Sequence, residues 1–204
     1  MENTLADRDK AVIWHPYTQM KTALDPIALV RGEGVYLFDE NGNRYLDAVS
    51  SWWVNLHGHA HPHIAKRVAE QLNTLEHAIF AGFTHEPAIE LAEKLLTILP
   101  DTQKKIFYSD NGSTAVEVAL KMCIQYWSNK SQQRTKVLAF NNAYHGDTFG
   151  AMAVSARSAF TAPFDSLLFE VVFVDTPNAD NLGSLKSQIS DLKSQISSFI
   201  YEPL

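Results

Sequence analysis

The second half of the chain alternates short apolar runs with helical patterns, and this alternation constrains the fold more than any other feature. Runs rich in β-branched and aromatic residues recur from Lys105 onward, with the letters KKIFYSD, KVLAF, FEVVFV and SSFIYE. Helical patterns lie between them, the longest being NGSTAVEVALKMCIQYW. Strands that alternate with helices form parallel sheets, because a parallel pair needs a long crossover connection. We therefore predict an α/β fold with a parallel sheet and flanking helices.

The segment before the last apolar run contains a tandem duplication, LKSQISD followed by LKSQISS. Apolar residues recur along it at spacings of four and three, at Leu185, Ile189, Leu192, Ile196 and Phe199. These spacings indicate an amphipathic helix with one buried face, and the repeat is too short for a coiled coil. We predict a crossover helix here.

The first hundred residues follow a different pattern. A short polar segment that could be helical precedes Pro16, which favours a turn. Between residues 28 and 51, the turn sequences GEG and NG separate strand-forming runs and predict an antiparallel meander. Residues 62–98 show two amphipathic helical patterns, each of which opens at a proline.

The charge balance argues against several classes of partner. The chain carries 17 Lys and Arg against 23 Asp and Glu, a net charge of −6, and no basic run that would neutralise phosphates or anionic lipids. We therefore expect no nucleic-acid partner and no membrane partner. The chain has no 18-residue apolar run and its first residues lack the apolar core of a signal peptide, so we expect it to be neither exported nor membrane-spanning.

The single cysteine, Cys123, rules out an intramolecular disulfide framework and a cysteine-based zinc cluster. This usage suits a reducing compartment, and we expect a cytoplasmic location. Cys123 lies in the helical pattern ALKMCIQYW among apolar neighbours. We therefore interpret it as a buried, inert thiol.

The sequence SDNGST at residues 109–114 lies between an apolar run at residues 106–108 and a helical pattern. A small glycine-containing loop that delivers free amides at a helix N-terminus can hold a phosphate group. Asn, Ser and Thr are also ordinary N-cap residues, so a plain helix cap explains the same letters. Both interpretations stay open from the residues alone.

A second polar loop, NAYHGDT at residues 142–148, follows the strand pattern at residues 137–140. Open α/β sheets place ligands at the carboxyl ends of their strands. An aromatic ring, an imidazole and a carboxylate gathered there could stack on and hydrogen-bond a planar cofactor. A polar turn capped by Asp147 is an equally good explanation.

The segment from Ser50 to His63 combines two adjacent tryptophans with histidines at alternate positions 57, 59, 61 and 63. Imidazole rings can bind zinc, copper or nickel. Glycine and proline interrupt the segment and no nearby carboxylate completes a ligand set, so we expect no metal site. Neighbouring residues of a strand point to opposite sides, so Trp52 and Trp53 cannot both enter one core, and one of them should face a cavity or a partner.

Several motifs occur in the order and at the spacing of one enzyme family. They are WHPYTQ at residues 14–19, SSWW at residues 50–53, the turn at residues 58–62, FTH at residues 83–85 and AYHGDT at residues 143–148. Over its whole length the chain resembles the class III, fold-type I pyridoxal-phosphate aminotransferases. The His-Pro-Tyr and Trp-Trp motifs make it most similar to the members that act in biotin synthesis.

This resemblance implies pyridoxal 5'-phosphate as the cofactor and a homodimer as the complete enzyme. It also implies transfer of an amino group from S-adenosylmethionine to 8-amino-7-oxononanoate, which gives 7,8-diaminononanoate. Residues 1–60 would form an N-terminal arm and meander within a small domain. Residues 61–204 would form the first part of the large cofactor-binding α/β domain.

The resemblance also assigns roles to individual residues. Gly112 and Ser113 would donate to the cofactor phosphate, Tyr144 would stack on the pyridine ring, and Glu202 would belong to a Glu-Pro element below the cofactor. The implied substrate pocket consists of Tyr17, Trp52, Trp53, Tyr144 and Asp147.

Family members are much longer than this chain, and their remaining part carries the aspartate that pairs with the pyridine nitrogen and the lysine that forms the Schiff base. No lysine here matches that motif, so we expect no catalytic residue in this segment and an inactive chain in isolation. The run SSFIYE followed by Pro203-Leu204 looks cut within the sheet. The alternatives are another class III ω-aminotransferase, a truncated relic that only binds or assembles, and, third, a histidine metal-binding module.

Overall fold

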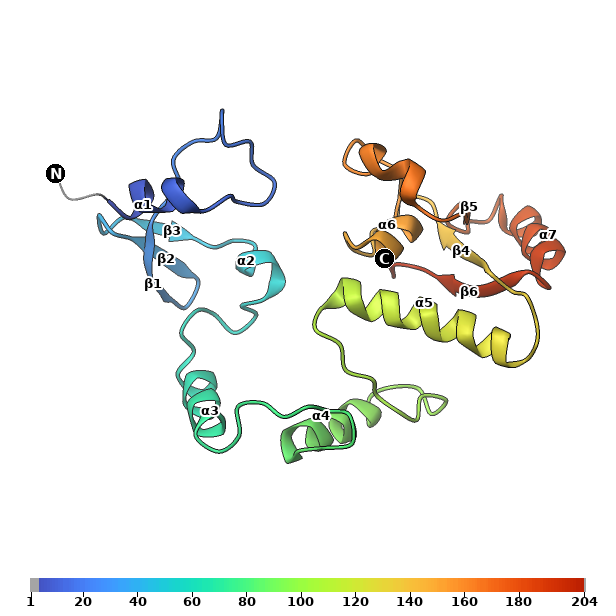
Figure 1. Ribbon diagram of the computed structural model, residues 1–204, viewed down its shortest axis with the longest axis horizontal. Helices are drawn as coiled ribbons and strands as arrows, with labels where there is room; N and C mark the ends of the chain where they lie inside the picture. Colours follow the sequence, from blue (N-terminus) through green and yellow to red (C-terminus); the bar gives the residue numbers. More distant parts are fainter. Residues whose placement is uncertain (1–3, 204) are drawn as a thin grey trace. The chain divides into compact units, whose positions relative to one another are not determined.

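The structure is a computed structural model that describes residues 4–203, and the chain in it divides into two units (Figure 1). The first unit extends to Glu90 and the second begins at Leu91. The division into two units follows the contacts between residues of this chain and does not test the predicted domain boundaries. The predicted assignment of residues 1–60 and 61–204 to the two domains of the family fold stays a prediction.

The first unit begins with helix α1 (Leu5–Val12), as predicted. Thr4 and Asp7 form a capping box, because the Thr4 hydroxyl accepts the Asp7 amide at 3.1 Å and the Asp7 carboxylate accepts the Thr4 amide at 3.1 Å. Strands β1 (Leu29–Glu33), β2 (Tyr36–Asp39) and β3 (Arg44–Leu46) follow as an antiparallel sheet in the order β1-β2-β3. The predicted meander is confirmed.

Three helices complete the elements that begin in this unit: α2 (Ser50–Trp53), α3 (Pro62–Leu72) and α4 (Glu86–Leu96). Helices α3 and α4 confirm the two amphipathic patterns. Helix α3 has proline in its first turn, where the missing amide hydrogen costs no intrahelical bond.

The second unit consists of α5 (Gly112–Asn129), β4 (Lys136–Phe140), α6 (Phe149–Val154), the 3-10 turn η1 (Ala162–Leu167), β5 (Val171–Val174), α7 (Leu182–Leu192) and β6 (Ile196–Ile200). Strand β4 pairs in parallel with both β5 and β6, so the sheet order is β5-β4-β6. The α/β prediction is confirmed.

Strand β4 is buried on both faces, as a central parallel strand should be. Val137 and Ala139 pack with Leu120 of α5 and Val154 of α6. Leu138 packs on the other side with Leu185 of α7. Because successive strand residues point to opposite faces, this one strand joins two apolar clusters.

Three predictions about element boundaries are wrong. Residues 104–109 pair with no strand among residues 4–203, although the sequence predicts a strand there. The apolar run has strand-forming side chains but lacks a neighbouring strand to complete a ladder. Helix α7 ends at Leu192, so Ile196 and Phe199 belong to β6, and β6 itself ends at Ile200, before Glu202.

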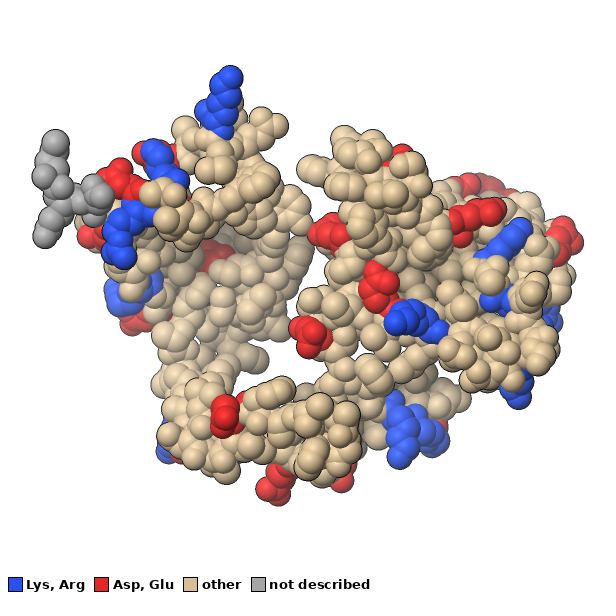
Figure 2. All heavy atoms as spheres, viewed as in Figure 1, with Lys and Arg blue, Asp and Glu red and all other residues tan. Residues whose placement is uncertain are grey.

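Within the described part of the chain, no helix combines the length and the apolar character that crossing a lipid bilayer requires. Figure 2 shows Lys and Arg side chains dispersed over the face in view, among Asp and Glu side chains.

Candidate active site

The N-terminus of α5 combines the two alternatives that the sequence left open. Asn111 caps the helix, because its Oδ1 accepts the Thr114 amide at 3.0 Å and the Thr114 hydroxyl accepts the Asn111 amide at 3.1 Å. This cap uses only the third amide of the helix. Helix geometry leaves the amides of Gly112 and Ser113 without intrahelical partners, so they can still donate to an anion.

The loop after β4 carries Tyr144, whose side chain is 60% exposed. Its hydroxyl donates to Oδ2 of Asp147 at 2.9 Å, and its backbone amide donates to Oε2 of Glu202 at 3.1 Å. Glu202 follows β6, the strand beside β4. The carboxyl ends of two parallel strands thus bring Tyr144 and Glu202 together, as the fold rule for open sheets expects.

One pocket of about 510 Å³ joins these groups. All four residues that the resemblance assigns to the cofactor line it, together with neighbours from the same loops: Asn111, Gly112, Ser113, Val116, Tyr144, His145, Gly146, Tyr201, Glu202 and Pro203. The lining therefore combines amide donors at a helix N-terminus, an aromatic side chain and a carboxylate. The binding role of these residues stays a prediction.

Gly146 and Ser113 form the seam between the two loops. Gly146 has φ +131°, and a Cβ atom added to it would lie 2.8 Å from Cβ of Ser113. The amide of the next residue, Asp147, donates to the Ser113 hydroxyl oxygen at 3.3 Å. The loops touch so closely that only glycine fits at position 146.

Glu117 on α5 anchors the far end of the Tyr144 loop. Its Oε1 accepts the amides of Gly150 at 2.6 Å and Ala151 at 3.3 Å, in the first turn of α6. Thr148, the N-cap residue of α6, makes no side-chain cap. The sequence prediction missed Glu117, because nothing in the letters links a mid-helix glutamate to amides 33 residues further on.

His145 is a half-buried residue that lines the same pocket. Within residues 4–203 its Nε2 has no hydrogen-bond partner, while its backbone amide donates to the Ser155 hydroxyl at 2.8 Å. Burial lowers the pKa of His145, and the negative charge of Glu202 opposes that shift. The lowered pKa favours the uncharged form of the ring at neutral pH.

The remaining predicted substrate residues belong to the first unit. The rings of Tyr17 and Trp52 meet edge to face, with centroids 5.5 Å apart and planes at 63°. Trp52 is 62% exposed and Trp53 is 76% exposed. The structure thus brings Tyr17 and Trp52 together, pairs Tyr144 with Asp147, and leaves both tryptophans accessible to a ligand or a partner.

The turn that carries these tryptophans has an uncommon backbone. Ser50, Ser51, Trp52 and Trp53 have φ values of 50°, 48°, 59° and 67°, so four successive non-glycine residues adopt the left-handed conformation. This conformation costs about 1–2 kcal/mol per residue for L-amino acids. Surrounding contacts must hold the turn, and the strand that the sequence considered for these residues does not form.

The histidines of residues 57–63 do not converge on a metal site. Nε2 of His59 lies 2.8 Å from Oδ2 of Asp47, and the rings of His57 and His61 have centroids 6.2 Å apart. No group of three or more metal-ligating side chains occurs in the part of the chain that the structure describes. The carboxylate beside His59 comes from Asp47, which the sequence did not associate with it.

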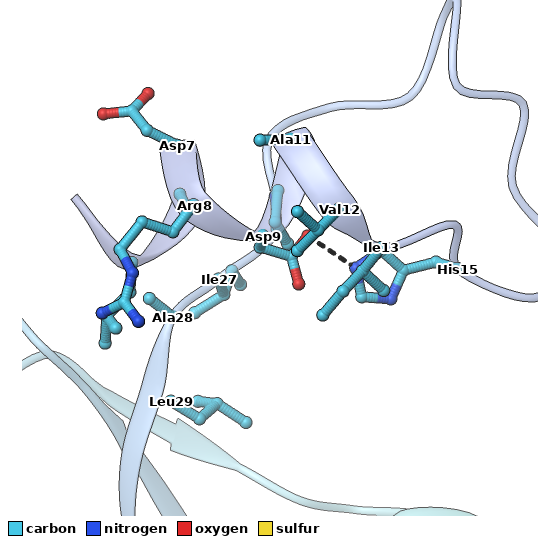
Figure 3. A pocket seen from close by; sticks show the side chains of 13 residues that line it. Asp7, Arg8, Asp9, Ala11, Val12, Ile13, His15, Ile27, Ala28 and Leu29 are labelled. Carbon is cyan, nitrogen blue, oxygen red and sulfur yellow. Dashed lines mark hydrogen bonds and ion pairs between the residues drawn. The ribbon is translucent and has the colours of Figure 1, made fainter. Parts of the chain in front are cut away.

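A larger pocket of about 690 Å³ lies between α1 and the segment that leads into β1 (Figure 3). Val12, Ile13 and Ile27 give it apolar walls, and the ring of His15 is held by Asp9 at 2.8 Å. It contains none of the predicted site residues. The volume of a pocket therefore does not identify the candidate active site in this protein. The chemical character of the residues that line the smaller pocket identifies it.

Comparison with known proteins decides the family. The family model described as aminotransferase class-III matches residues 17–204. The chain belongs to the class III aminotransferase family. An adenosylmethionine-8-amino-7-oxononanoate aminotransferase of Synechococcus elongatus is 57% identical over 165 residues, which are 81% of this chain and 39% of that protein.

Solved structures of class III aminotransferases agree with the fold. The adenosylmethionine-8-amino-7-oxononanoate aminotransferase of Methanocaldococcus jannaschii matches with a TM-score of 0.89 and 40% identity, over 96% of this chain and 45% of that one. An omega transaminase of Pseudomonas jessenii in complex with PMP matches with a TM-score of 0.89 and 29% identity, over 98% and 49% of the two chains. The present chain thus spans less than half the length of each of these three relatives.

Proposed function

We propose that this chain forms part of a pyridoxal-phosphate-dependent aminotransferase of biotin synthesis. In the complete polypeptide the reaction would transfer an amino group from S-adenosylmethionine to 8-amino-7-oxononanoate. The observation that carries the proposal is the pocket in which Gly112, Ser113, Tyr144 and Glu202 converge. The 57% identical relative, which bears the name of this enzyme, supports the choice of substrates.

The pocket fits the cofactor that the family uses. The amides of Gly112 and Ser113 at the start of the 18-residue helix α5 suit a phosphate dianion, because they donate directly and the helix dipole adds positive potential. The Ser113 hydroxyl accepts the Asp147 amide, which leaves its own hydrogen free to be donated. The exposed ring of Tyr144 provides a flat surface for an aromatic ligand.

Once bound, pyridoxal phosphate supplies the electron sink that lets an amino group exchange with a carbonyl group. The protein's contribution in this unit is binding and orientation. Asp147 accepts the Tyr144 hydroxyl hydrogen, so the oxygen of that hydroxyl faces a substrate amine as an acceptor. Glu202 holds the backbone of Tyr144 in place through its amide.

The aromatic group of the first unit suits a long apolar substrate. Tyr17, Trp52 and Trp53 offer exposed aromatic rings, which favours the alkyl chain of 8-amino-7-oxononanoate over a short dicarboxylate. We propose that these three residues bind substrate in the complete enzyme, and that Tyr144 and Asp147 of the second unit also bind substrate. We also propose a cytoplasmic homodimer.

A second candidate is another class III ω-aminotransferase. The structural match to the omega transaminase of Pseudomonas jessenii favours it, since the TM-score equals that of the Methanocaldococcus jannaschii enzyme. The lower sequence identity, 29% against 40%, counts against it.

The test uses the purified full-length gene product supplied with pyridoxal phosphate. We expect 7,8-diaminononanoate to form from S-adenosylmethionine and 8-amino-7-oxononanoate, detected by chromatography with mass spectrometry. Turnover of an ω-amine with pyruvate, without formation of 7,8-diaminononanoate, would replace the proposal by the second candidate. Absence of both reactions in a protein that binds the cofactor would refute the aminotransferase proposal.

A further inference from the structure

The left-handed turn Ser50–Trp53 needs a physical explanation, because it places two exposed tryptophans on a backbone that L-amino acids avoid. Uncommon backbone conformations persist where their surroundings over-determine them, and they concentrate at functional sites. The contacts that hold this turn therefore indicate which residues matter for the presentation of Trp52.

Asp47 is the main anchor of the turn. Its Oδ1 accepts the Ser51 amide at 2.9 Å, and its Oδ2 accepts the Ser51 hydroxyl at 2.7 Å. Its backbone carbonyl accepts the Ser50 amide at 3.3 Å. The Asp47 side chain is 6% exposed, so its carboxylate depends on these protein donors more than on water.

His59 connects that anchor to the β-sheet. Its Nε2 donates to Oδ2 of Asp47 at 2.8 Å, and its side chain is 13% exposed. Its backbone amide and carbonyl exchange hydrogen bonds with Gly34 at 2.7 and 3.1 Å. A Cβ atom on Gly32 would lie 2.7 Å from Cβ of His59, so the ring packs directly against the hairpin.

We propose that Asp47 and His59 are positioning residues that hold the left-handed turn so that Trp52, in edge contact with Tyr17, presents a fixed aromatic wall to the substrate's alkyl chain. This inference rests on the proposed function, which places Tyr17 and Trp52 at the substrate. The chain of support runs from the sheet through His59 to Asp47, then through Ser51 to Trp52. Neither Asp47 nor His59 touches the substrate in this scheme.

Asp39 provides a matched control within the same unit. It is another buried carboxylate, and it accepts hydrogen bonds from the Asn41 and Asn43 amides, the Asn43 side chain and the Tyr45 hydroxyl. These bonds lie in the turn between β2 and β3 and reach no residue of the Ser50–Trp53 turn. Loss of its charge should weaken the meander without moving Trp52.

The first experiment compares Asp47→Asn with Asp39→Asn in the full-length gene product. For Asp47→Asn we expect the KM for 8-amino-7-oxononanoate to rise about tenfold or more, because a wall displaced by an ångström loses its contacts, while kcat changes less than about threefold. Asp39→Asn should lower the Tm and leave KM unchanged. Ser51→Ala, which removes one hydroxyl bond, is the milder variant if Asp47→Asn does not fold, and its KM should rise about threefold or more.

The second experiment detects changes in the conformation of the Ser50–Trp53 turn and requires no assay of activity. The protein is labelled with 5-fluorotryptophan, and the fluorine resonances of Trp52 and Trp53 are assigned through Trp52→Phe and Trp53→Phe. Asp47→Asn and His59→Leu should shift these two resonances and leave those of Trp14 and Trp127 in place. His59→Gln keeps a side-chain donor for Asp47 and should resemble the wild type.

The outcomes distinguish a failure of the positioning role of Asp47 and His59 from a failure of the proposed function. The positioning role is refuted if the wild-type protein turns over the substrate and neither Asp47→Asn nor Ser51→Ala changes the KM or the Trp52 resonance. Equal effects of Asp47→Asn and Asp39→Asn on KM would overturn it as well, by showing a merely structural contribution. A wild-type protein without either amino-transfer reaction would instead refute the proposed function.

Discussion

The Tyr144 hydroxyl donates to the Asp147 carboxylate at 2.9 Å, and this bond fixes the one large aromatic side chain that projects from the loop after β4. The Tyr144 amide is held at the same time by Glu202, from the end of the neighbouring strand. The bond to Asp147 thus restrains the ring and the bond to Glu202 restrains its backbone, so a ligand that stacked on the ring would cost little further side-chain entropy.

Replacement of Tyr144 by Ala should weaken cofactor binding by about threefold to tenfold, the effect of one lost aromatic contact. Titration of the apoprotein with pyridoxal phosphate, followed by visible absorbance, measures the change. Tyr144→Phe keeps the ring and should bind the cofactor almost as well as the wild type. Cys123→Ala, at a half-buried helical position, should change the Tm modestly and leave the titration unaltered. Equal losses for Tyr144→Ala and Cys123→Ala would contradict the assignment of Tyr144 to the site.

Gly146→Ala should destabilise the second unit by about 1–3 kcal/mol, since the added Cβ meets Ser113 and the backbone has φ +131°. Urea unfolding gives the free-energy change. Gly183→Ala in α7 is the control: nothing lies within 4 Å of the position that its Cβ atom would occupy, and alanine at a helical position should stabilise by about 0.5–1 kcal/mol. Stabilisation, or no change, in Gly146→Ala would contradict the close approach of the two loops.

Removal of the Glu117 carboxylate should release the first turn of α6. For Glu117→Ala we expect a loss of about 1–3 kcal/mol, because two buried amides lose their acceptor. Hydrogen exchange should accelerate at the amides of Gly150 and Ala151. Glu93→Ala, at an exposed position of α4, serves as the control and should leave both amides protected. Unchanged exchange in Glu117→Ala would rule out the carboxylate as their acceptor.

Asp47 should give the first unit a specific sensitivity to acid. Hydrogen bonds from the Ser51 amide and hydroxyl, followed by the His59 contact, lower the pKa of Asp47 to about 2. A carboxyl with a lowered pKa stabilises the folded state above its unfolded pKa of about 3.9, and this contribution is lost as the pH falls toward 2. In urea unfolding between pH 6 and pH 2, the stability difference between wild type and Asp47→Asn should shrink below pH 4. A difference that stays constant over this range would contradict the ionised, hydrogen-bonded state.

The 204-residue chain expressed by itself should associate in solution. Strands β5 and β6 are the edges of the described sheet, and Phe199 of β6 and Tyr201, which follows this strand, expose apolar surface. Unpaired edges with apolar side chains template intermolecular pairing. Size-exclusion chromatography with light scattering should show oligomers or aggregates. A monodisperse monomer with a sharp thermal transition would contradict this expectation.

The sequence predicted most elements because their signals are local. The burial of Val137, Leu138 and Ala139 matches the apolar letters of the run KVLAF, and a central parallel strand needs no other information. The Asn111 cap could be predicted from residue type alone. The run at residues 106–108 shows the limit of such signals, since a strand exists only where another strand pairs with it.

The sequence by itself determined the α/β class, the meander, the helix starts and the loops in which Gly112, Ser113, Tyr144 and Asp147 occur. Only the tertiary structure decided how these loops meet: Gly146 closes on Ser113, Glu117 caps α6, and His59 reaches Asp47. The reason is physical. Local propensities depend on a few neighbouring residues, whereas these contacts join groups 12 or more positions apart in the sequence. Tertiary packing brings such residues within hydrogen-bond distance, and a local sequence pattern cannot predict this.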